Sequence, residues 1–431
     1  MRRFLVIQTA FLGDAVLATA LLEKLRAFHP DAVIDLVVRK GNEGLFDGHP
    51  FLNQLHIWDK RSGKTRDLFR LIGALRKTEY DHIINCQRFL STGLMTVLAR
   101  GKEKIGYDKN PLSFLFTRKV KHVIGDGRHE ADRLNELIEH LTDGSRPLPC
   151  LYPAEKHKAE AGPSSPYVCI APASVWFTKQ WPEQKWIELI RALPAEQRVL
   201  LIGAPGDAPL CERIATAAGR GDVLAGKISL LGTAALMHSA MMNYVNDSAP
   251  LHIASAMNAP VTAIFCSTVP AFGFGPLRKN GRVLETREQL DCRPCGLHGH
   301  SACPKGHFKC AMAISTVSVV GNTIPTPREF DLEASVTFMR SDEGGRRRPA
   351  FNGYTPTHQF KDHEELNDGE HFYPNAGQMA PGETGIVMIQ LKHPERNHGA
   401  LQEGISFSVQ EGNHVIGTGR IIRVLNPRLQ F

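Results

Sequence analysis

The sequence predicts two α/β domains built on parallel sheets, followed by a small all-β barrel or sandwich. Three observations support this fold class. Apolar runs of strand length alternate with helical patterns up to about residue 150, and the alternation restarts at about residue 167. From about Thr316 onward only short β-rich runs remain, separated by Gly, Pro and Asn. A chain of 431 residues is also long enough for two or three domains.

The first domain begins with the strand pattern RRFLVIQ, which leads into a helix. In that helix apolar side chains recur at helical spacing until His29-Pro30 ends it. The apolar positions are Val16, Leu17, Ala20, Leu21 and Leu25. The segment AVIDLVVR predicts a second strand, and DLFRLIGALRKTEYDHIINC predicts a helix followed by a strand. This order is typical of a parallel sheet with helices on both faces.

The N-terminus imitates a secretory signal, because two arginines precede an apolar stretch and an Ala-x-Ala triplet. Gln8 and Asp14 interrupt that stretch, and Glu23-Lys24 continues it as an amphipathic helix. No run reaches the roughly 18 apolar residues that a membrane-spanning helix needs. We therefore expect a mature strand and helix, and a location in the cytoplasm or peripherally at the inner face of the inner membrane. The net charge of +7 fits an anionic ligand such as a nucleotide or a phosphorylated lipid.

The second domain starts after a polar segment, LYPAEKHKAEAGPSSP, which predicts a linker over residues 151–166. Beyond it, YVCIAPAS, RVLLIGAP and PVTAIFCST predict strands, and EQKWIELIRAL predicts a helix. Parallel α/β sheets bind ligands at the carboxyl ends of their strands. Two such halves on either side of a linker therefore predict a ligand cleft between them.

Asp14 follows Gly13 at the point where the first strand pattern becomes helical. A carboxylate at this point has two interpretations. It can cap the first turn of the helix, or it can act as a general base at the mouth of a cleft. Position alone favours neither interpretation.

The segment ASVWFTKQWPEQKW, residues 173–186, lies between a predicted strand and a predicted helix. We expect Ser174, Thr178 and Lys179 at the positive end of that helix, where a diphosphate gains backbone N–H groups, hydroxyl donors and a cation. Pro182-Glu183 is ordinary helix-start chemistry. Because Lys179 is not needed to start the helix, we interpret it as a ligand-binding residue.

The segment YVNDSAPLHIASAM, residues 244–257, ends a predicted strand and begins a helix. Asp247 and Ser248 are good capping residues at this place. His252 follows about one helical turn later and can face the same ligand. Capping with a structural histidine and ligand binding are equally compatible with the spacing.

Three stretches in this order resemble glycosyltransferase family 9, which contains the lipopolysaccharide heptosyltransferases. They are FLGDAVLATALL, SVWFTKQWP and NDSAPLHIASAMNAPVTAIFCSTVPAFGFGP, and the resemblance covers about residues 1–314. It implies a GT-B arrangement of two Rossmann-like domains that face each other. It also implies ADP-heptose as the donor, held mainly by the second domain, and the inner core or lipid A of lipopolysaccharide as the acceptor.

The resemblance assigns roles to the candidate residues. Asp14 matches the general base of an inverting transfer. The donor-binding residues are Ser174, Thr178 and Lys179 in the diphosphate segment, with Asp247, Ser248 and His252 in the following turn. An acceptor hydroxyl needs a base when it attacks the anomeric carbon, and the leaving diphosphate needs a cation. Lys179 and a helix N-terminus can supply that charge, so we expect no catalytic metal or other cofactor.

The segment CRPCGLHGHSACPKGHFKC brings four cysteines together within one short stretch, Cys292, Cys295, Cys303 and Cys310. Four thiolates can bind a structural zinc ion tetrahedrally. The middle gap is short for a zinc ribbon, in which roughly 12–20 residues are usual. The alternative is a set of buried or redox-active thiols in a loop near the donor.

The C-terminal segments at residues 342–356 and 409–425, DEGGRRRPAFNGYTP and VQEGNHVIGTGRIIRVL, resemble the third domain of elongation factor Tu, a β-barrel. In that family the barrel helps to bind aminoacyl-tRNA and partner proteins. The resemblances divide the chain into an acceptor domain at 1–160, a donor domain at 167–314 and a barrel at 322–428. An alternative function is a catalytically silent protein whose barrel binds RNA or a translation-related partner. We expect no DNA binding, and the sequence does not identify the barrel's partner.

Overall fold

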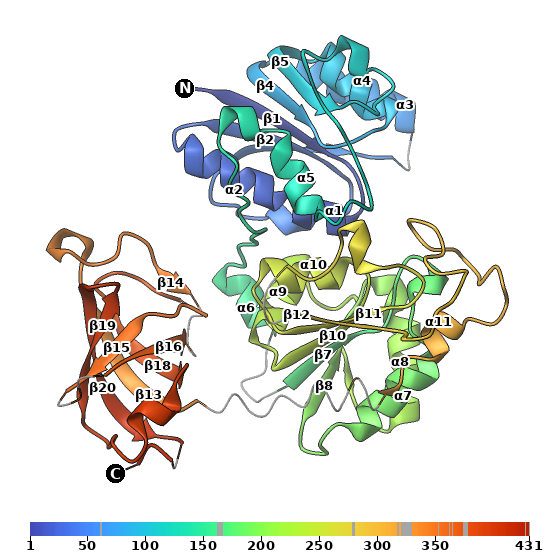
Figure 1. Ribbon diagram of the computed structural model, residues 1–431. Coiled ribbons are helices and arrows are strands. Elements are labelled where there is room, and N and C mark those ends of the chain that lie inside the picture. The colour runs from blue at the N-terminus through green and yellow to red at the C-terminus, as the bar shows by residue number, and fades with distance from the viewer. Residues whose placement is uncertain are drawn as a thin grey trace. The chain divides into compact units, whose positions relative to one another are not determined.

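The computed structural model confirms the predicted fold class, with two parallel α/β sheets and a closed antiparallel β-barrel (Figure 1). It describes residues 1–60, 63–161, 167–277, 281–316, 319, 330–351, 353–361, 363, 365–373, 378–426 and 428–430. The chain forms two compact units, Met1–Ile324 and Pro325–Phe431. The first unit contains both sheets and the second is the barrel. The expected start of the barrel, residue 322, lies outside the described residues.

The first sheet has the strand order β3-β2-β1-β4-β5-β6, and its neighbouring strands pair in parallel. Its strands are β1 (Arg3–Gln8), β2 (Val33–Arg39), β3 (Leu52–Trp58), β4 (Glu79–Asn85), β5 (Arg100–Tyr107) and β6 (Arg118–Val120). Its helices are α1 (Leu12–Leu17), α2 (Thr19–Phe28), α3 (Lys64–Leu75), α4 (Leu90–Leu98) and α5 (Glu130–Glu136), with 3-10 turns η1 (Glu43–Phe46), η2 (Ser113–Leu115) and η3 (Glu139–Leu141).

The central strand β1 is buried on both faces, as the apolar run predicts. Phe4 and Val6 belong to the core under α2 and α5, whereas Leu5 and Ile7 belong to the core under α3 and α4. Figure 1 shows these two helix pairs on opposite faces of the sheet. This alternation follows from the period of two in a strand.

The single helix expected after β1 is divided into α1 and α2 at Ala18. The Thr19 hydroxyl donates a hydrogen bond to the Val16 carbonyl at 2.7 Å and accepts one from the Cys150 backbone N–H at 2.9 Å. A threonine that bonds back to the preceding turn often bends a helix. All five apolar positions predicted for this helix are nevertheless buried.

The second sheet has the order β12-β11-β10-β7-β8-β9, again with parallel pairs. Its strands are β7 (Tyr167–Ala171), β8 (Arg198–Leu201), β9 (Asp222–Val223), β10 (Met242–Asn246), β11 (Val261–Phe265) and β12 (Gly281–Glu285). Its helices are α7 (Glu183–Ala192), α8 (Ala208–Ala218), α9 (Leu230–Ser239), α10 (Ala249–Ala256) and α11 (Lys309–Met312), with 3-10 turns η4 (Phe177–Lys179), η5 (Pro205–Asp207) and η6 (Pro270–Phe272). In the described ranges, no helix combines the length and apolarity needed to cross a membrane.

The linker prediction is wrong for part of its range, because α6 (Glu155–Ala161) lies within it. Its sequence EKHKAEA consists mostly of good helix formers. The helix packs against α9, and the Glu160 carboxylate accepts the Ser229 backbone N–H at 2.8 Å. Residues 162–166, the rest of the predicted linker, lie outside the described residues.

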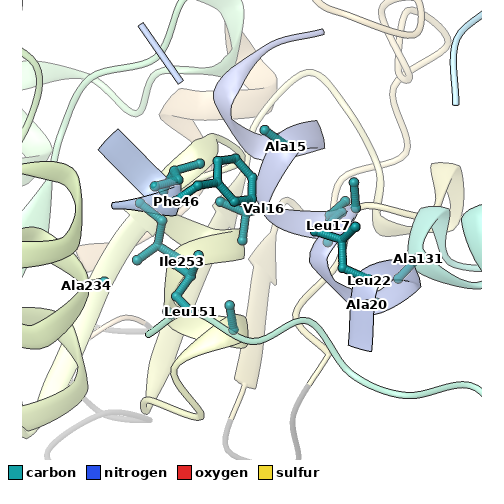
Figure 2. Close-up of a cluster of buried hydrophobic side chains, with 14 of the residues drawn as sticks. Ala15, Val16, Leu17, Ala20, Leu22, Phe46, Ala131, Leu151, Ala234 and Ile253 are labelled. Atoms are coloured by element: carbon teal, nitrogen blue, oxygen red, sulfur yellow. The ribbon is translucent and has the colours of Figure 1, made fainter. Parts of the chain in front are cut away.

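One apolar core runs continuously through both α/β halves. It joins the α2 and α5 face of the first sheet to the α9 and α10 face of the second sheet. Figure 2 shows Ala15 and Val16 of α1 close to Phe46 and to Ile253 of α10. The two halves therefore fold as one body, and the short helices α1 and α10 meet at its centre.

The second unit is a closed barrel with the strand order β13-β18-β16-β15-β19-β20, in which neighbouring strands pair antiparallel. Its strands are β13 (Leu332–Phe338), β15 (Thr357–Phe360), β16 (Leu366–Phe372), β18 (Thr384–Leu391), β19 (Ser406–Glu411) and β20 (His414–Val424), with 3-10 turns η7 (Ser341–Glu343) and η8 (Pro394–Asn397). The short strands β14 (Ala350–Phe351) and β17 (Gln378–Met379) form a separate pair. Closure removes exposed sheet edges. Of the two architectures that the sequence predicted for this unit, the structure has the barrel and not the sandwich.

The two segments that carry the elongation factor resemblance meet in the barrel. The Arg346 guanidinium pairs with the Glu411 carboxylate and lies over the Tyr354 ring, 4.0 Å from its centroid. The Tyr354 hydroxyl donates to the same carboxylate at 2.9 Å. Arg346 therefore has a structural role, and the resemblance to the elongation factor domain stays a prediction.

Candidate active site

The candidate site lies where the carboxyl ends of β1 and β10 lead into α1 and α10. Asp14 is in the first turn of α1, and Asp247 follows β10 directly. The two helices pack so closely that a Cβ atom on Gly13 would approach Cδ2 of His252 to 2.7 Å. Glycine at position 13 therefore permits the two strand ends to come together.

Asp14 has surroundings that disfavour its ionised form. Burial, and after it the carboxylate of Glu130, raise the pKa of Asp14 to about 6, against the opposing effects of two backbone N–H groups and of Lys179. One of those N–H groups belongs to Phe11, the residue that precedes α1, so Asp14 also forms half of a capping box. The cap and the raised pKa therefore coexist in the same side chain.

Glu130 belongs to a charge network that the sequence analysis did not identify. It begins α5, and its carboxylate accepts a hydrogen bond from the buried guanidinium of Arg133 at 3.0 Å. Its backbone N–H donates to the carbonyl of Gly273 in the second half at 2.8 Å. Arg133 also donates to the carbonyl of Phe272 at 3.1 Å. These contacts tie α5 to the second half beside the candidate base.

Lys179 and Asp247 form an ion pair in the second half, with Nζ 2.7 Å from Oδ2. Their side chains are only 16% and 5% exposed, so the charges are largely shielded from solvent. The Thr268 hydroxyl donates to the same carboxylate oxygen at 2.5 Å. Since Lys179 also acts electrostatically on Asp14, the structure brings these residues of the two halves into one site.

The diphosphate segment differs from the sequence prediction in its position. Lys179 ends the 3-10 turn η4, and α7 begins only at Glu183. The three candidate residues therefore precede the helix and do not line its first turn. Ser174 is half-buried, and its carbonyl accepts a hydrogen bond from the Gln180 side chain at 2.7 Å.

Thr178 is bound within the protein. Its side chain is buried, and its hydroxyl accepts hydrogen bonds from the Ser267 hydroxyl at 3.1 Å and from the His300 backbone N–H at 2.8 Å. The Thr178 backbone N–H donates in return to the His300 carbonyl at 3.1 Å. In this conformation Thr178 holds the cysteine-rich segment against the Lys179 turn.

The residues at the start of α10 have different environments. Ser248 occupies the capping position, but its side chain makes no capping hydrogen bond and instead donates to the Asn246 carbonyl at 3.4 Å. His252 is buried at the contact with Gly13, and its ring lies edge-on to Phe274. Burial, with His129 and Lys179 nearby, lowers the pKa of His252 to about 3, so this imidazole is neutral.

Asn246, the last residue of β10, is a positioning residue that was not among the candidate site residues. Its buried amide accepts the Trp181 backbone N–H at 2.9 Å and donates to the Pro172 carbonyl at 2.7 Å. It therefore clamps both ends of the loop that carries Lys179. The available signal was a polar side chain at the end of a buried strand, and Thr268 lies three residues beyond the end of β11.

The structure does not confirm the structural zinc site that the cysteine-rich segment suggested. Within the described part of the chain, no three His, Cys, Asp or Glu side chains are arranged to hold a metal ion. Cys310 is buried and the other three thiols are half-buried. Burial acts to raise the pKa of the Cys303 thiol, but backbone N–H groups at 305–308 outweigh it, and the pKa lies below its usual value. Those turn amides therefore favour the thiolate form of Cys303.

Comparison with known proteins identifies the family. The model of glycosyltransferase family 9 (heptosyltransferase) matches residues 68–301. Lipopolysaccharide heptosyltransferase 3 of Escherichia coli is 30% identical over 308 residues, which are 65% of this chain and 90% of that protein.

Solved structures agree on the fold. A family 9 glycosyltransferase from Veillonella parvula aligns with a TM-score of 0.65 at 21% identity, over 74% of this chain and 95% of that one. The ADP-heptose lipopolysaccharide heptosyltransferase II of E. coli aligns with a TM-score of 0.62 at 21% identity, over 74% and 97%. The α/β unit thus has the GT-B fold. This chain belongs to glycosyltransferase family 9, the heptosyltransferase family, and is a glycosyltransferase.

Proposed function

We propose that this protein transfers a heptose from ADP-heptose to the inner core or lipid A part of lipopolysaccharide, with inversion at the anomeric carbon. Its relatives support the substrates, because they are named as lipopolysaccharide heptosyltransferases and one of them is named as an ADP-heptose heptosyltransferase. The observation that carries the proposal is a carboxyl group with a pKa of about 6 in electrostatic reach of a lysine from the opposite half. A group with such a pKa accepts a proton efficiently near neutral pH.

Asp14 is the general base in this proposal. Its carboxylate removes the proton from an acceptor hydroxyl while the hydroxyl oxygen forms a bond to the anomeric carbon. The bond between that carbon and the diphosphate oxygen breaks on the opposite face, which inverts the configuration. ADP leaves with the electron pair of the broken bond. Proton removal of this kind contributes roughly 10²–10⁴-fold to a rate.

Lys179 stabilises the leaving ADP. In the free protein Asp247 neutralises its ammonium group at 2.7 Å, so the lysine is held in place before the donor arrives. A bound diphosphate competes for the same cation or shares it with Asp247. Fixed charge in a site shielded from water stabilises a leaving anion without reorganisation. Transfer by this mechanism requires no metal ion.

The acceptor is a membrane lipid, so we place the reaction in the cytoplasm at the inner face of the inner membrane. The barrel is a binding module, and we assign no partner to it. Its His358 and His371 are buried, with their Nε2 atoms 2.7 Å apart.

A mass-spectrometric transfer assay tests the proposal. The purified chain is incubated with core-truncated lipid and with each member of a panel of nucleotide sugars. We expect one heptose to be added from ADP-heptose and little transfer from ADP-glucose or UDP-sugars. A preference for another donor would contradict the heptose assignment, and no transfer from any donor would contradict the reaction.

A further inference from the structure

Two neighbouring loops of the first half expose apolar side chains at the carboxyl edge of its sheet. Phe89 and Leu90 follow β4, and Phe114 and Leu115 follow the adjacent strand β5. The four side chains are 59%, 53%, 71% and 49% exposed, in that order. Asp14 follows β1 at the same carboxyl edge, so these residues and the candidate base lie at the same end of the strands. We call these four residues the apolar rim.

The two loops are braced as one surface. The buried amide of Asn110 donates hydrogen bonds to the carbonyls of Gln87 and Phe89, at 3.2 and 3.1 Å. The same side chain accepts the Leu112 backbone N–H at 2.9 Å. Phe116, next to the exposed pair, is buried and anchors the second loop against the sheet. These contacts hold the backbone of the two loops in place, so the four side chains of the apolar rim form one surface.

Basic residues surround the second loop. Between Tyr107 and Lys121 the chain has four basic residues and a single acidic one, Asp108. The four basic side chains are all exposed, and they are Lys109, Arg118, Lys119 and Lys121. Arg118 lies 3.5 Å from Glu103, whereas the three lysines make no ion pair with any residue that the structure describes.

This combination separates two classes of partner. Protein interfaces are depleted in lysine at their buried centres, because an ammonium group is costly to desolvate. At a membrane surface, by contrast, lysine keeps its charge among anionic headgroups while aromatic and leucine side chains enter the acyl boundary. Exposed apolar residues in a loop that is flanked in sequence by lysines without an ion pair among the described residues therefore fit an anionic bilayer better than a protein.

We propose that the apolar rim and its lysines dock the protein on an anionic phospholipid bilayer. This inference rests on the proposed function, in which the acceptor is a lipid anchored in that bilayer. Docking through the carboxyl edge of the first sheet turns the side of the protein that bears Asp14 toward the membrane. The acceptor sugar then reaches the base while its acyl chains stay in the lipid.

Vesicle flotation with the full chain tests the docking surface. The vesicles contain either equal parts of phosphatidylethanolamine and phosphatidylglycerol, or phosphatidylcholine alone. We expect binding only to the anionic vesicles. The double variant Phe114→Ser/Leu115→Ser is expected to bind about tenfold more weakly, and Lys109→Gln/Lys119→Gln/Lys121→Gln at least about tenfold more weakly. Raised salt weakens the lysine contribution.

A matched control is Phe69→Ser, because Phe69 is 55% exposed on α3 and lies outside the rim. It is expected to bind like the unmodified protein, and thermal unfolding shows whether each variant is folded. Unchanged vesicle binding by folded Phe114→Ser/Leu115→Ser overturns the inference. Self-association through the rim in sedimentation, without vesicle binding, overturns it as well.

A second readout separates this inference from the proposed function. Phe114→Ser/Leu115→Ser is expected to transfer heptose to a deacylated, water-soluble acceptor within about twofold of the unmodified rate, since neither residue contacts the candidate site. Loss of vesicle binding with transfer retained supports the docking surface. Rim-dependent vesicle binding in a protein without any transfer leaves the surface standing and contradicts the proposed function instead.

Discussion

Asp14 and Asp247 occupy comparable places in the two halves, but their carboxylates have different electrostatic surroundings. Each lies at the end of a central strand where the next helix begins. Asp247 has Lys179 at 2.7 Å and the Thr268 hydroxyl at 2.5 Å. Asp14 has no cation within ion-pair distance among the described residues, and a second carboxylate, Glu130, acts on it.

The difference indicates a division of labour between the halves. A paired carboxylate that is also hydrogen-bonded holds a cation in place, which suits the binding of a diphosphate. An unpaired carboxylate that is partly removed from solvent is less stable when ionised, which suits the acceptance of a proton. In the function proposed above, the same residue type thus serves binding in one half and proton transfer in the other.

The largest expected effect comes from Asp14→Asn, which keeps the shape of the side chain and removes its basicity. We expect heptose transfer to fall about 10²–10⁴-fold, because no base is left to accept the acceptor proton. The dissociation constant for ADP-heptose, measured by calorimetry, is expected to change less than about threefold. Asp31→Asn, at an exposed carboxylate, is the matched control. Normal turnover in Asp14→Asn would contradict the proposal that Asp14, unlike Asp247, accepts a proton.

Lys179→Met tests the role of the ion pair between Lys179 and Asp247. We expect donor affinity to fall roughly 10–100-fold, because a cation that contacts the diphosphate is lost. The substitution also leaves Asp247 buried without its partner, which destabilises the protein. The double variant Lys179→Met/Asp247→Asn is expected to recover stability but not donor affinity. Lys185→Met, which alters a lysine near Glu188 on α7, is the control. Recovery of donor affinity in the double variant would show that Lys179 serves only to neutralise Asp247.

Asp14→Asn is also expected to stabilise the α/β unit at pH 7. The folded-state pKa of Asp14 lies above its ordinary value, so its contribution to stability is present at low pH and is lost as pH rises through about 6. Removing the ionised carboxylate is expected to gain about 2 kcal/mol at pH 7, or about 3 °C in the midpoint of thermal unfolding. Below about pH 4 the difference disappears. Equal midpoints of thermal unfolding for Asp14→Asn and the unmodified protein at pH 7 would mean that the ionised Asp14 carboxylate does not destabilise the fold.

The smallest expected effect concerns Glu130. In the unmodified enzyme, kcat/KM for the acceptor is expected to rise with pH around a midpoint near the Asp14 pKa of about 6 and to level off above it. Glu130→Gln removes a negative charge that raises this pKa, so the midpoint moves to lower pH while the plateau is retained. An unchanged midpoint in a folded Glu130→Gln variant would show that burial alone sets the pKa of Asp14.

The fold was predictable because it depends on local patterns. Buried parallel strands such as Phe4–Ile7 are continuous apolar runs, and the alternation with helices determines the class of sheet. The helix α6 was missed because a Pro- and Ser-containing segment surrounds a few good helix formers. The β-rich character of the C-terminal unit was predicted, but β15 and β16 were not, and closure depends on the pairing of β13 with β20, which are distant in sequence.

The candidate site was predictable in its individual residues but not in their partners. Asp14, Lys179 and Asp247 could be named because each interrupts or follows an apolar run. The ion pair between the last two joins different strand ends, and the influence of Glu130 on Asp14 joins different helices. Such long-range contacts leave no periodicity in the sequence. Capping by Ser248 was one of two interpretations that the spacing left open, and its side chain makes no capping hydrogen bond.

The account depends on the difference in ionisation between the two acids, and an infrared titration of the Asp14 carboxylate measures it most directly. The spectrum of Asp14→Asn is subtracted from that of the unmodified protein at each pH, so that the remaining carboxylate band belongs to Asp14. We predict a single titration with a midpoint of about 6. A midpoint at or below about 4, the ordinary value for an aspartate, would contradict the account.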